Sequence, residues 1–173
     1  MAFDKMLTED SQNLELFELI KLGKIVDSLY ISPKKRGIFV VGGAIRDILT
    51  NSFPADLDLV VEDDPENFAK KIAKKIKGRL VKIGKEKEVL YRVISKNKNI
   101  DITQIQGASI NEDLSRRDFT INAMAYDLYS GVIIDNHGGR QDIAEKRVRM
   151  VTKSSFNRDP IRQIGRASCR ERV

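Results

Sequence analysis

The chain has 173 residues, of which 41% are hydrophobic and 32% are charged, as in an ordinary globular domain with a buried core. No apolar run approaches the about 20 residues of a membrane-spanning helix, and no secretory signal is visible, so we expect a cytoplasmic protein without membrane association. The net charge of +6 is compatible with a polyanionic partner. The single histidine and single cysteine exclude a His/Cys metal cluster, so any metal should be a hard ion held by oxygen.

The first third of the chain is predicted to hold a helix, a strand and a second helix, in that order. We assign residues 1–36 to an N-terminal helical extension, because their apolar side chains recur at roughly helical spacing. The β-branched and aromatic run Ile38–Val41 predicts a buried strand. Gly42 and Gly43 interrupt this run, and residues 44–49 are expected to form a short helix.

The middle of the chain predicts one well-delimited helix among several strands. Asp64 and Pro65 are typical of a helix start, since a capping carboxylate is followed by proline at the first helical position. Apolar residues then share one face until Gly78, which should end the helix, and the lysines opposite them are interpreted as a solvated face. Further strands are expected at 57–61, 80–83, 89–95 and 100–105, with a hairpin turn between the last two.

The last part of the chain is predicted to contain a helical region over 111–126 and a short strand at Val132–Ile134. No internal repeat or low-complexity segment is visible. Together these elements indicate an α/β (α+β) protein, with a mixed sheet flanked by helices.

Three aspartates on predicted strands are candidates for the chemistry of a metal site, two as metal ligands and the third, Asp101, as a metal ligand or a base. Asp56 and Asp58 are two residues apart at the entry to a strand, so their carboxylates point to the same side. Asp101 lies between isoleucines on another strand, where a lone buried acid would be costly without a partner. Carboxylates of this kind hold the divalent metal that phosphoryl and nucleotidyl transfer require.

Two further motifs offer contacts for a nucleotide. Gly42 and Gly43, between a strand and a helix, allow close backbone approach to phosphate, although a tight structural turn is the alternative interpretation. Arg117 is suited to bidentate phosphate contacts, whereas Asp118 and Asn122 are suited to ribose hydroxyls. An exposed polar helix start is the alternative for this second group.

The order and spacing of these motifs resemble the class II CCA-adding enzymes and the bacterial poly(A) polymerases. Residues 42–59 look like the first motif of that family, and 116–123 are similar to its second almost letter for letter. Residues 135–142 resemble its third motif, and 159–162 the start of its fourth. The agreement extends over about residues 38–162.

The resemblance implies a polymerase-β-like nucleotidyltransferase fold for a head domain at 37–162. It implies that Asp56 and Asp58 bind the catalytic Mg²⁺ and that Asp101 is the third acidic residue of the site. The residues that would hold the triphosphate and ribose are Gly42, Gly43, Arg46, Asp47, Arg117, Asp118 and Asn122. Asp159 and Arg162 would present hydrogen-bonding groups to the incoming base.

The same resemblance implies an Mg²⁺-dependent enzyme that adds nucleotides from CTP and ATP to the 3′ end of tRNA without a template. Poly(A) addition, or a split enzyme adding only CC or only A, stays open because the head motifs are shared. A non-catalytic head that binds RNA or nucleotide is a second alternative. An unrelated small nucleotidyltransferase acting on an antibiotic or a protein is a third. No stable protein partner is implied.

The C-terminal end departs from the family pattern. Arg158 stands where the family often has an acid, and Gly165 where it usually has an arginine. Residues 164–173 can be encoded by a nucleotide string that matches a common short-read sequencing adapter. We therefore expect native sequence to stop at Arg162, with 163–173 an adapter artefact and the head truncated before its neck and body. The alternative, a genuine basic tail, is decided by sequencing the source DNA past the Arg162 codon.

Overall fold

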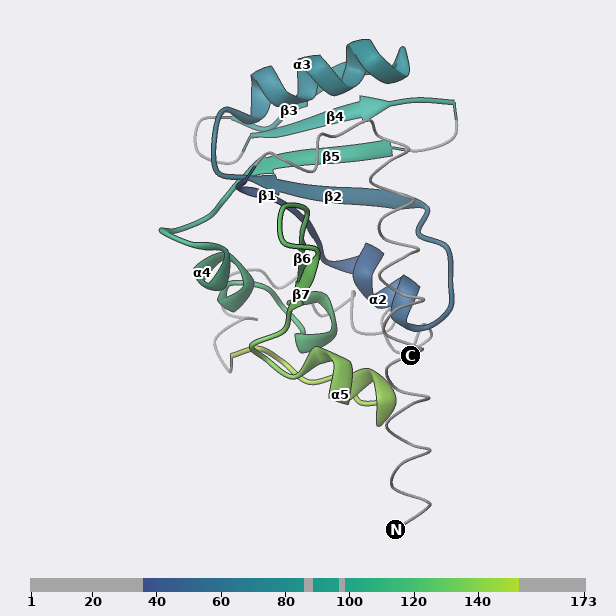
Figure 1. The fold of residues 1–173 in the computed structure, drawn as a ribbon, viewed down its shortest axis with the longest axis vertical. Helices are drawn as coiled ribbons and strands as arrows, with labels where there is room; N and C mark the ends of the chain where they lie inside the picture. The colour runs from purple at the N-terminus through teal and green to yellow at the C-terminus, as the bar shows by residue number, and fades with distance from the viewer. Residues whose placement is uncertain (1–35, 86–88, 97–98, 153–173) are drawn as a thin grey trace.

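The computed structural model describes residues 36–85, 89–96 and 99–152, and these build a seven-stranded sheet with helices on both faces (Figure 1). The strand order is β3-β4-β5-β2-β1-β6-β7. The strands are β1 (Ile38–Val41), β2 (Asp56–Val61), β3 (Arg79–Ile83), β4 (Leu90–Ile94), β5 (Asn99–Gln104), β6 (Ala125–Asp127) and β7 (Val132–Ile134). The helices are α2 (Gly43–Leu49), α3 (Pro65–Ile76), α4 (Ile110–Ser115) and α5 (Gly139–Ala144), with a 3₁₀ turn η1 (Thr120–Asn122).

The sheet is mixed because one pair of neighbouring strands runs parallel. β2 pairs with β5 in parallel, whereas every other pair in the described sheet is antiparallel. The chain leaves β2, passes through α3 and the β3–β4 hairpin, and returns on β5 beside β2. Two strands that are far apart in the sequence therefore become neighbours at the centre of the sheet.

Alternation along the strands separates two packed faces. Leu57 and Leu59 of β2, with Ile100 and Ile102 of β5, belong to the main core beneath α2 and α3. Val60 points to the other face, where it packs with α4 in a smaller apolar cluster. Asp56 and Asp58 share the parity of Val60, so they face the α4 side of the sheet.

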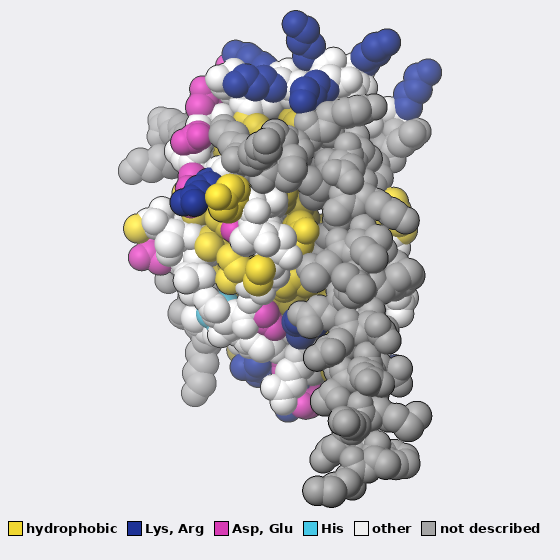
Figure 2. Space-filling model, viewed as in Figure 1, with side chains coloured by type: hydrophobic (Ala, Val, Ile, Leu, Met, Phe, Trp, Pro, Cys, Tyr) yellow, Lys and Arg dark blue, Asp and Glu magenta, His cyan; other side chains and the backbone are white. Residues whose placement is uncertain are grey.

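Helix α3 forms as its sequence predicts, although its end has another cause. Asp64 accepts a hydrogen bond from the backbone N–H of Asn67, and Pro65 occupies the first turn. The left-handed residue at the end is Lys77, with φ of 53°, rather than Gly78. Gly78 is required by packing, because a Cβ there would lie 2.8 Å from Val93 Cγ1. The lysines of α3 gather on the exposed side (Figure 2).

The helical region predicted over 111–126 is confirmed up to Ser115 and wrong for most of the remainder. Helix α4 ends at Ser115, η1 supplies a single turn, and Ala125–Asp127 is the strand β6, which pairs with β1. The apolar residues in this stretch are buried in tertiary contacts, so their spacing did not report a helix. Helix α5 was not expected, and its only local signals are the glycines at 138 and 139.

The predicted mixed sheet flanked by helices is confirmed. No helix among the described residues is long and apolar enough to cross a membrane. The predicted helix within residues 1–35 lies outside the described residues, as do Asp159, Arg162 and the tail at 163–173. These expectations stay predictions.

Candidate active site

Strand register places two of the predicted acids side by side. Asp58 of β2 is the register partner of Asp101 of β5, and Asp101 is in turn the partner of Arg92 of β4. All three side chains point to the α4 face, because their neighbours Leu57, Tyr91 and Ile100 belong to the opposite core. A charged row of Arg92, Asp101 and Asp58 therefore crosses three adjacent strands.

Asp101 is held by a bidentate ion pair. Arg92 Nε donates to Asp101 Oδ1 at 2.7 Å, and Arg92 Nη2 donates to Oδ2 at 2.6 Å. These contacts raise the pKa of the Arg92 guanidinium, so the arginine stays charged. Both oxygens of Asp101 already have a donor, which makes it less available as a metal ligand than the sequence suggested.

In this charged row, Asp58 is the carboxyl group whose charged form is disfavoured. Burial raises the pKa of its carboxyl group above the usual value, and the neighbouring Asp101 and Asp56 raise it further. The guanidinium of Arg117 opposes these effects without cancelling them. Asp56 is more exposed, and its Oδ1 accepts a hydrogen bond of 3.1 Å from Asn99 Nδ2.

The glycine turn brings the first and second motifs together. Gly42 has φ of 72°, a left-handed conformation that side chains disfavour. A Cβ at Gly42 would lie 3.1 Å from Arg117 Nη1 and 3.4 Å from Asp58 Oδ2. The turn, the arginine and the acid therefore meet at one point, which the motif spacing alone did not reveal. Gly43 begins α2 directly after this turn.

Arg46 and Asp47 are internal rather than exposed to a ligand. Arg46 is only 5% exposed, and its Nε and Nη2 both donate to Asp47 Oδ1. Its Nη1 donates to Asn122 Oδ1 at 2.7 Å, which links α2 to η1. Asn122 Nδ2 reaches Asp118 Oδ1 at 3.4 Å. Arg46 thus orients the pair that was predicted to bind ribose.

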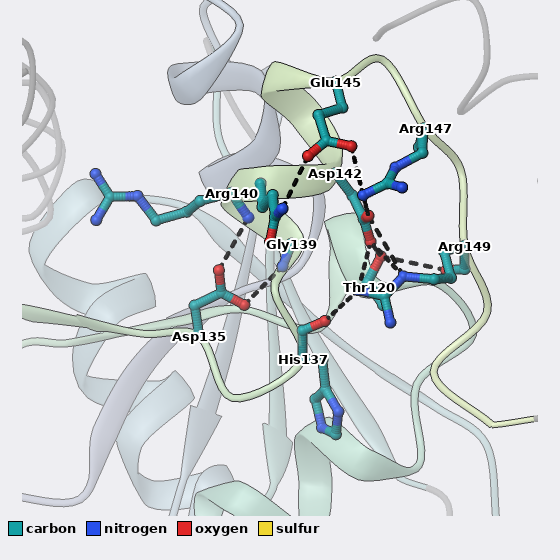
Figure 3. Close-up of polar contacts among 10 residues, drawn as sticks. Thr120, Asp135, His137, Gly139, Arg140, Asp142, Glu145, Arg147 and Arg149 are labelled. Atoms are coloured by element: carbon teal, nitrogen blue, oxygen red, sulfur yellow. Dashed lines mark hydrogen bonds and ion pairs between the residues drawn. The ribbon is translucent and has the colours of Figure 1, made fainter.

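The third motif forms a buried polar network behind η1 (Figure 3). Asp142 of α5 is fully buried, and its Oδ2 accepts hydrogen bonds from the Thr120 hydroxyl at 2.5 Å and from Arg149 Nε at 3.0 Å. Arg149 also donates to the carbonyl oxygen of His137. Asp135 accepts from the backbone N–H groups of Gly139 and Arg140, which fixes the start of α5. The network therefore supports the second motif from behind.

The acidic face fits a divalent cation in part. Asp56 and Asp58 supply oxygen donors of the type that Mg²⁺ prefers, and the raised pKa of Asp58 indicates a carboxylate that a cation would stabilise. Among the described residues, no three Asp, Glu, His or Cys side chains already converge as a closed metal site would. The fit is thus to a site of two carboxylates that remains open to other oxygen ligands.

Two residues of this region were missed by sequence reasoning. Arg92 gave no signal, because an arginine on a strand is ordinary until the register places it opposite Asp101. Asp113 is 5% exposed on α4 and accepts hydrogen bonds from Arg117. Asp113 could have been found from the sequence, because it shares the apolar side of a helix with Ile110 and Leu114 and precedes an arginine by four residues.

The mixed sheet, with the acidic row on its central strands and a glycine turn beside it, has the nucleotidyltransferase fold. A solved structure described as the complex of CCA-adding enzyme with ATP superimposes with a TM-score of 0.66 at 37% identity. The alignment covers 91% of this chain and 38% of that one.

Residues 38–149 match the family model of the poly(A) polymerase head domain, and the chain belongs to that family. It is 34% identical over 130 residues to a CC-adding tRNA nucleotidyltransferase of Geobacter sulfurreducens, covering 74% of this chain and 30% of that protein. It is 33% identical over 175 residues to an A-adding tRNA nucleotidyltransferase of Halalkalibacterium halodurans, covering 91% and 39% respectively. The chain thus spans about a third of the length of these relatives.

Proposed function

We propose that this chain is the catalytic head of a cytoplasmic tRNA nucleotidyltransferase, which adds nucleotides from CTP or ATP to the 3′ end of tRNA. The observation that carries the proposal is the meeting of Asp58, Gly42 and Arg117 beside the Asp101 row. It puts metal-binding oxygens, a glycine backbone turn and a phosphate-binding cation within reach of one triphosphate.

The reaction assigned to this site is transfer of a nucleotidyl group. A 3′-hydroxyl oxygen attacks the α-phosphorus of the nucleoside triphosphate, the bond from that phosphorus to its bridging oxygen breaks, pyrophosphate leaves, and the hydroxyl proton passes to water. Asp56 and Asp58 would hold Mg²⁺, which would supply charge neutralisation and activation of the attacking hydroxyl. Arg117 positions a phosphate group, whereas Asp118 and Asn122, braced by Arg46, face the sugar.

A calorimetric titration with ATP and CTP tests the binding half of the proposal. Affinity should require Mg²⁺, and Asp58→Asn should lower it by about tenfold or more because one metal ligand is lost. The matched control is Asp63→Asn, an exposed acid just past β2 with the same change in charge. Equal affinity in EDTA and in Mg²⁺ would remove the metal site from the proposal.

Release of pyrophosphate on addition of tRNA lacking its CCA end tests the catalytic half. Use of CTP alone indicates CC addition, use of ATP alone indicates A addition, and use of both indicates full CCA addition. Long products made from ATP alone indicate poly(A) addition. Metal-dependent nucleotide binding without transfer, in a chain extended to the length of its relatives, would favour the non-catalytic binding head instead.

A further inference from the structure

Helix α4 buries a carboxylate that none of the four sequence motifs contains. Asp113 is 5% exposed and lies beside Leu114, which packs against the sheet with Ile110. Burying a carboxylate is costly unless its oxygens gain hydrogen bonds or an opposite charge. The contacts of Asp113 therefore show what its burial accomplishes.

Both oxygens of Asp113 have donors. Oδ1 accepts from the backbone N–H of Gln106 at 2.9 Å, which ties the segment after β5 to α4. Oδ2 accepts from Arg117 Nη2 at 3.1 Å and from Nε at 3.3 Å. One oxygen thus serves the fold, and the other serves a single arginine.

The contact with Arg117 determines where that guanidinium points. Nε and Nη2 lie on one side of the rigid planar group, and both are directed to Asp113. The third nitrogen, Nη1, is therefore turned toward Gly42 and Asp58.

We propose that Asp113 is a positioning residue, which aims Arg117 Nη1 at the β- or γ-phosphate of the nucleotide without touching the nucleotide itself. This inference rests on the proposed function, because it presumes that the glycine turn receives a triphosphate. It predicts a specific defect on loss of Asp113. Discrimination between a triphosphate and a monophosphate falls, while contacts to the base and sugar are kept.

The test compares Asp113→Asn with Glu112→Gln in titrations of Mg·ATP and of AMP. Asp113→Asn can keep the acceptor for Gln106, but it places an NH₂ group against the two donors of Arg117. Glu112→Gln removes the same charge from the adjacent, exposed position, where the side chain accepts from Ala108 N–H instead. Thermal unfolding of both variants shows whether the fold is retained.

We expect Asp113→Asn to weaken Mg·ATP binding by about tenfold and AMP binding by less than about twofold, with Glu112→Gln close to wild type for both. The double variant Asp113→Asn with Arg117→Gln should bind Mg·ATP no more weakly than Arg117→Gln alone. Both substitutions remove the same contact, the one between Arg117 and the phosphate, so their effects should not add.

Several outcomes overturn the inference. If Asp113→Asn lowered the affinity for Mg·ATP and for AMP equally, the role of Asp113 would be purely structural. If Glu112→Gln lowered the Mg·ATP affinity as much as Asp113→Asn, the effect would come from the net charge of the protein and not from the contact with Arg117. Additive losses in the double variant would separate it from Arg117. If the wild-type protein binds no Mg·ATP, the proposed function itself fails and the inference falls with it; wild-type binding with unaffected Asp113→Asn refutes the inference alone.

Discussion

At the level of single residues, Asp58 lies half-buried near two other carboxylates, Asp56 and Asp101, and two guanidinium groups. Its folded-state pKa is raised above the ordinary value of an aspartate, mainly through burial. A raised carboxyl pKa means that folding disfavours the charged form, so the destabilisation appears as pH rises through the raised pKa and persists at neutral pH. A bound cation would offset both the cost of burying this charge and its repulsion by Asp101 and Asp56.

Asp58→Asn should therefore stabilise the metal-free head at pH 7 while abolishing its response to Mg²⁺. We expect the melting temperature in EDTA to rise by about a few degrees. The gain should vanish at a pH below the ordinary pKa of an aspartate, where Asp58 is protonated in both the folded and the unfolded state. Thermal unfolding in EDTA across this pH range measures it, and an unchanged or lower melting temperature at pH 7 would contradict the assignment of Asp58 as a strained acid.

Arg46 gives a second expectation at this scale. It connects Asp47 to Asn122 from a nearly buried position, so Arg46→Lys should lose the planar fork that serves both. We expect a loss of about 1–3 kcal/mol in unfolding free energy. Chemical denaturation measures it, with the exposed Arg79→Lys as the control. An effect equal to that control would mean that the Arg46 contacts contribute nothing to stability.

At the level of elements, the site depends on how α5 and η1 pack together. Gly139 begins α5 against η1, and a Cβ there would lie against the carbonyl oxygen of Thr120 and 3.0 Å from Met124 Sδ. The approach must be this close for Asp142 to reach the Thr120 hydroxyl (Figure 3). Gly139, the second glycine of the third motif, is therefore required for the packing of α5 against η1.

Gly139→Ala should push α5 away from η1 and cost about 1–3 kcal/mol of stability. Gln141→Ala, an exposed change in the same helix, should stay within about 0.5 kcal/mol of wild type. Urea denaturation of the two variants checks the prediction. If Gly139→Ala unfolded with the same free energy as the wild-type protein, the backbone at this contact would be able to shift at little cost.

At the level of the whole molecule, the sheet separates two charged surfaces. The lysines of α3 lie over the face opposite to Asp58, because α3 packs on the Leu57 and Ile100 side. Figure 2 shows these basic side chains gathered at one end of the molecule. The basic end and the acidic row are therefore separate regions of the head.

Reversing charge at Lys71 and Lys74 should leave Mg·ATP affinity within about twofold of wild type, since salt screens exposed charges beyond about 8–10 Å. Isothermal titration at 0.15 M salt measures this effect. A tenfold change would place α3 within the nucleotide site. Weaker RNA binding at unchanged nucleotide affinity would instead assign these lysines to the nucleic acid, with a reduced dependence on salt concentration.

The local pattern of the sequence determined several parts of this protein. Alternation along β2 placed Asp56 and Asp58 on one face, and Asp64 with Pro65 marked the start of α3, because each depends on neighbours within a turn or a strand. The Gly42 turn also followed from its own sequence. Such local signals were sufficient to predict a mixed sheet carrying an acidic pair.

Only the tertiary structure decided which distant residues meet. The parallel pairing of β2 with β5 set Asp58 beside Asp101, and the burial of α4 turned Asp113 into the support of Arg117. Residues 125–127 became a strand because β1 offered an unpaired edge there, against their helical spacing. Register and burial are properties of segments far apart in the chain, so no local pattern encodes them.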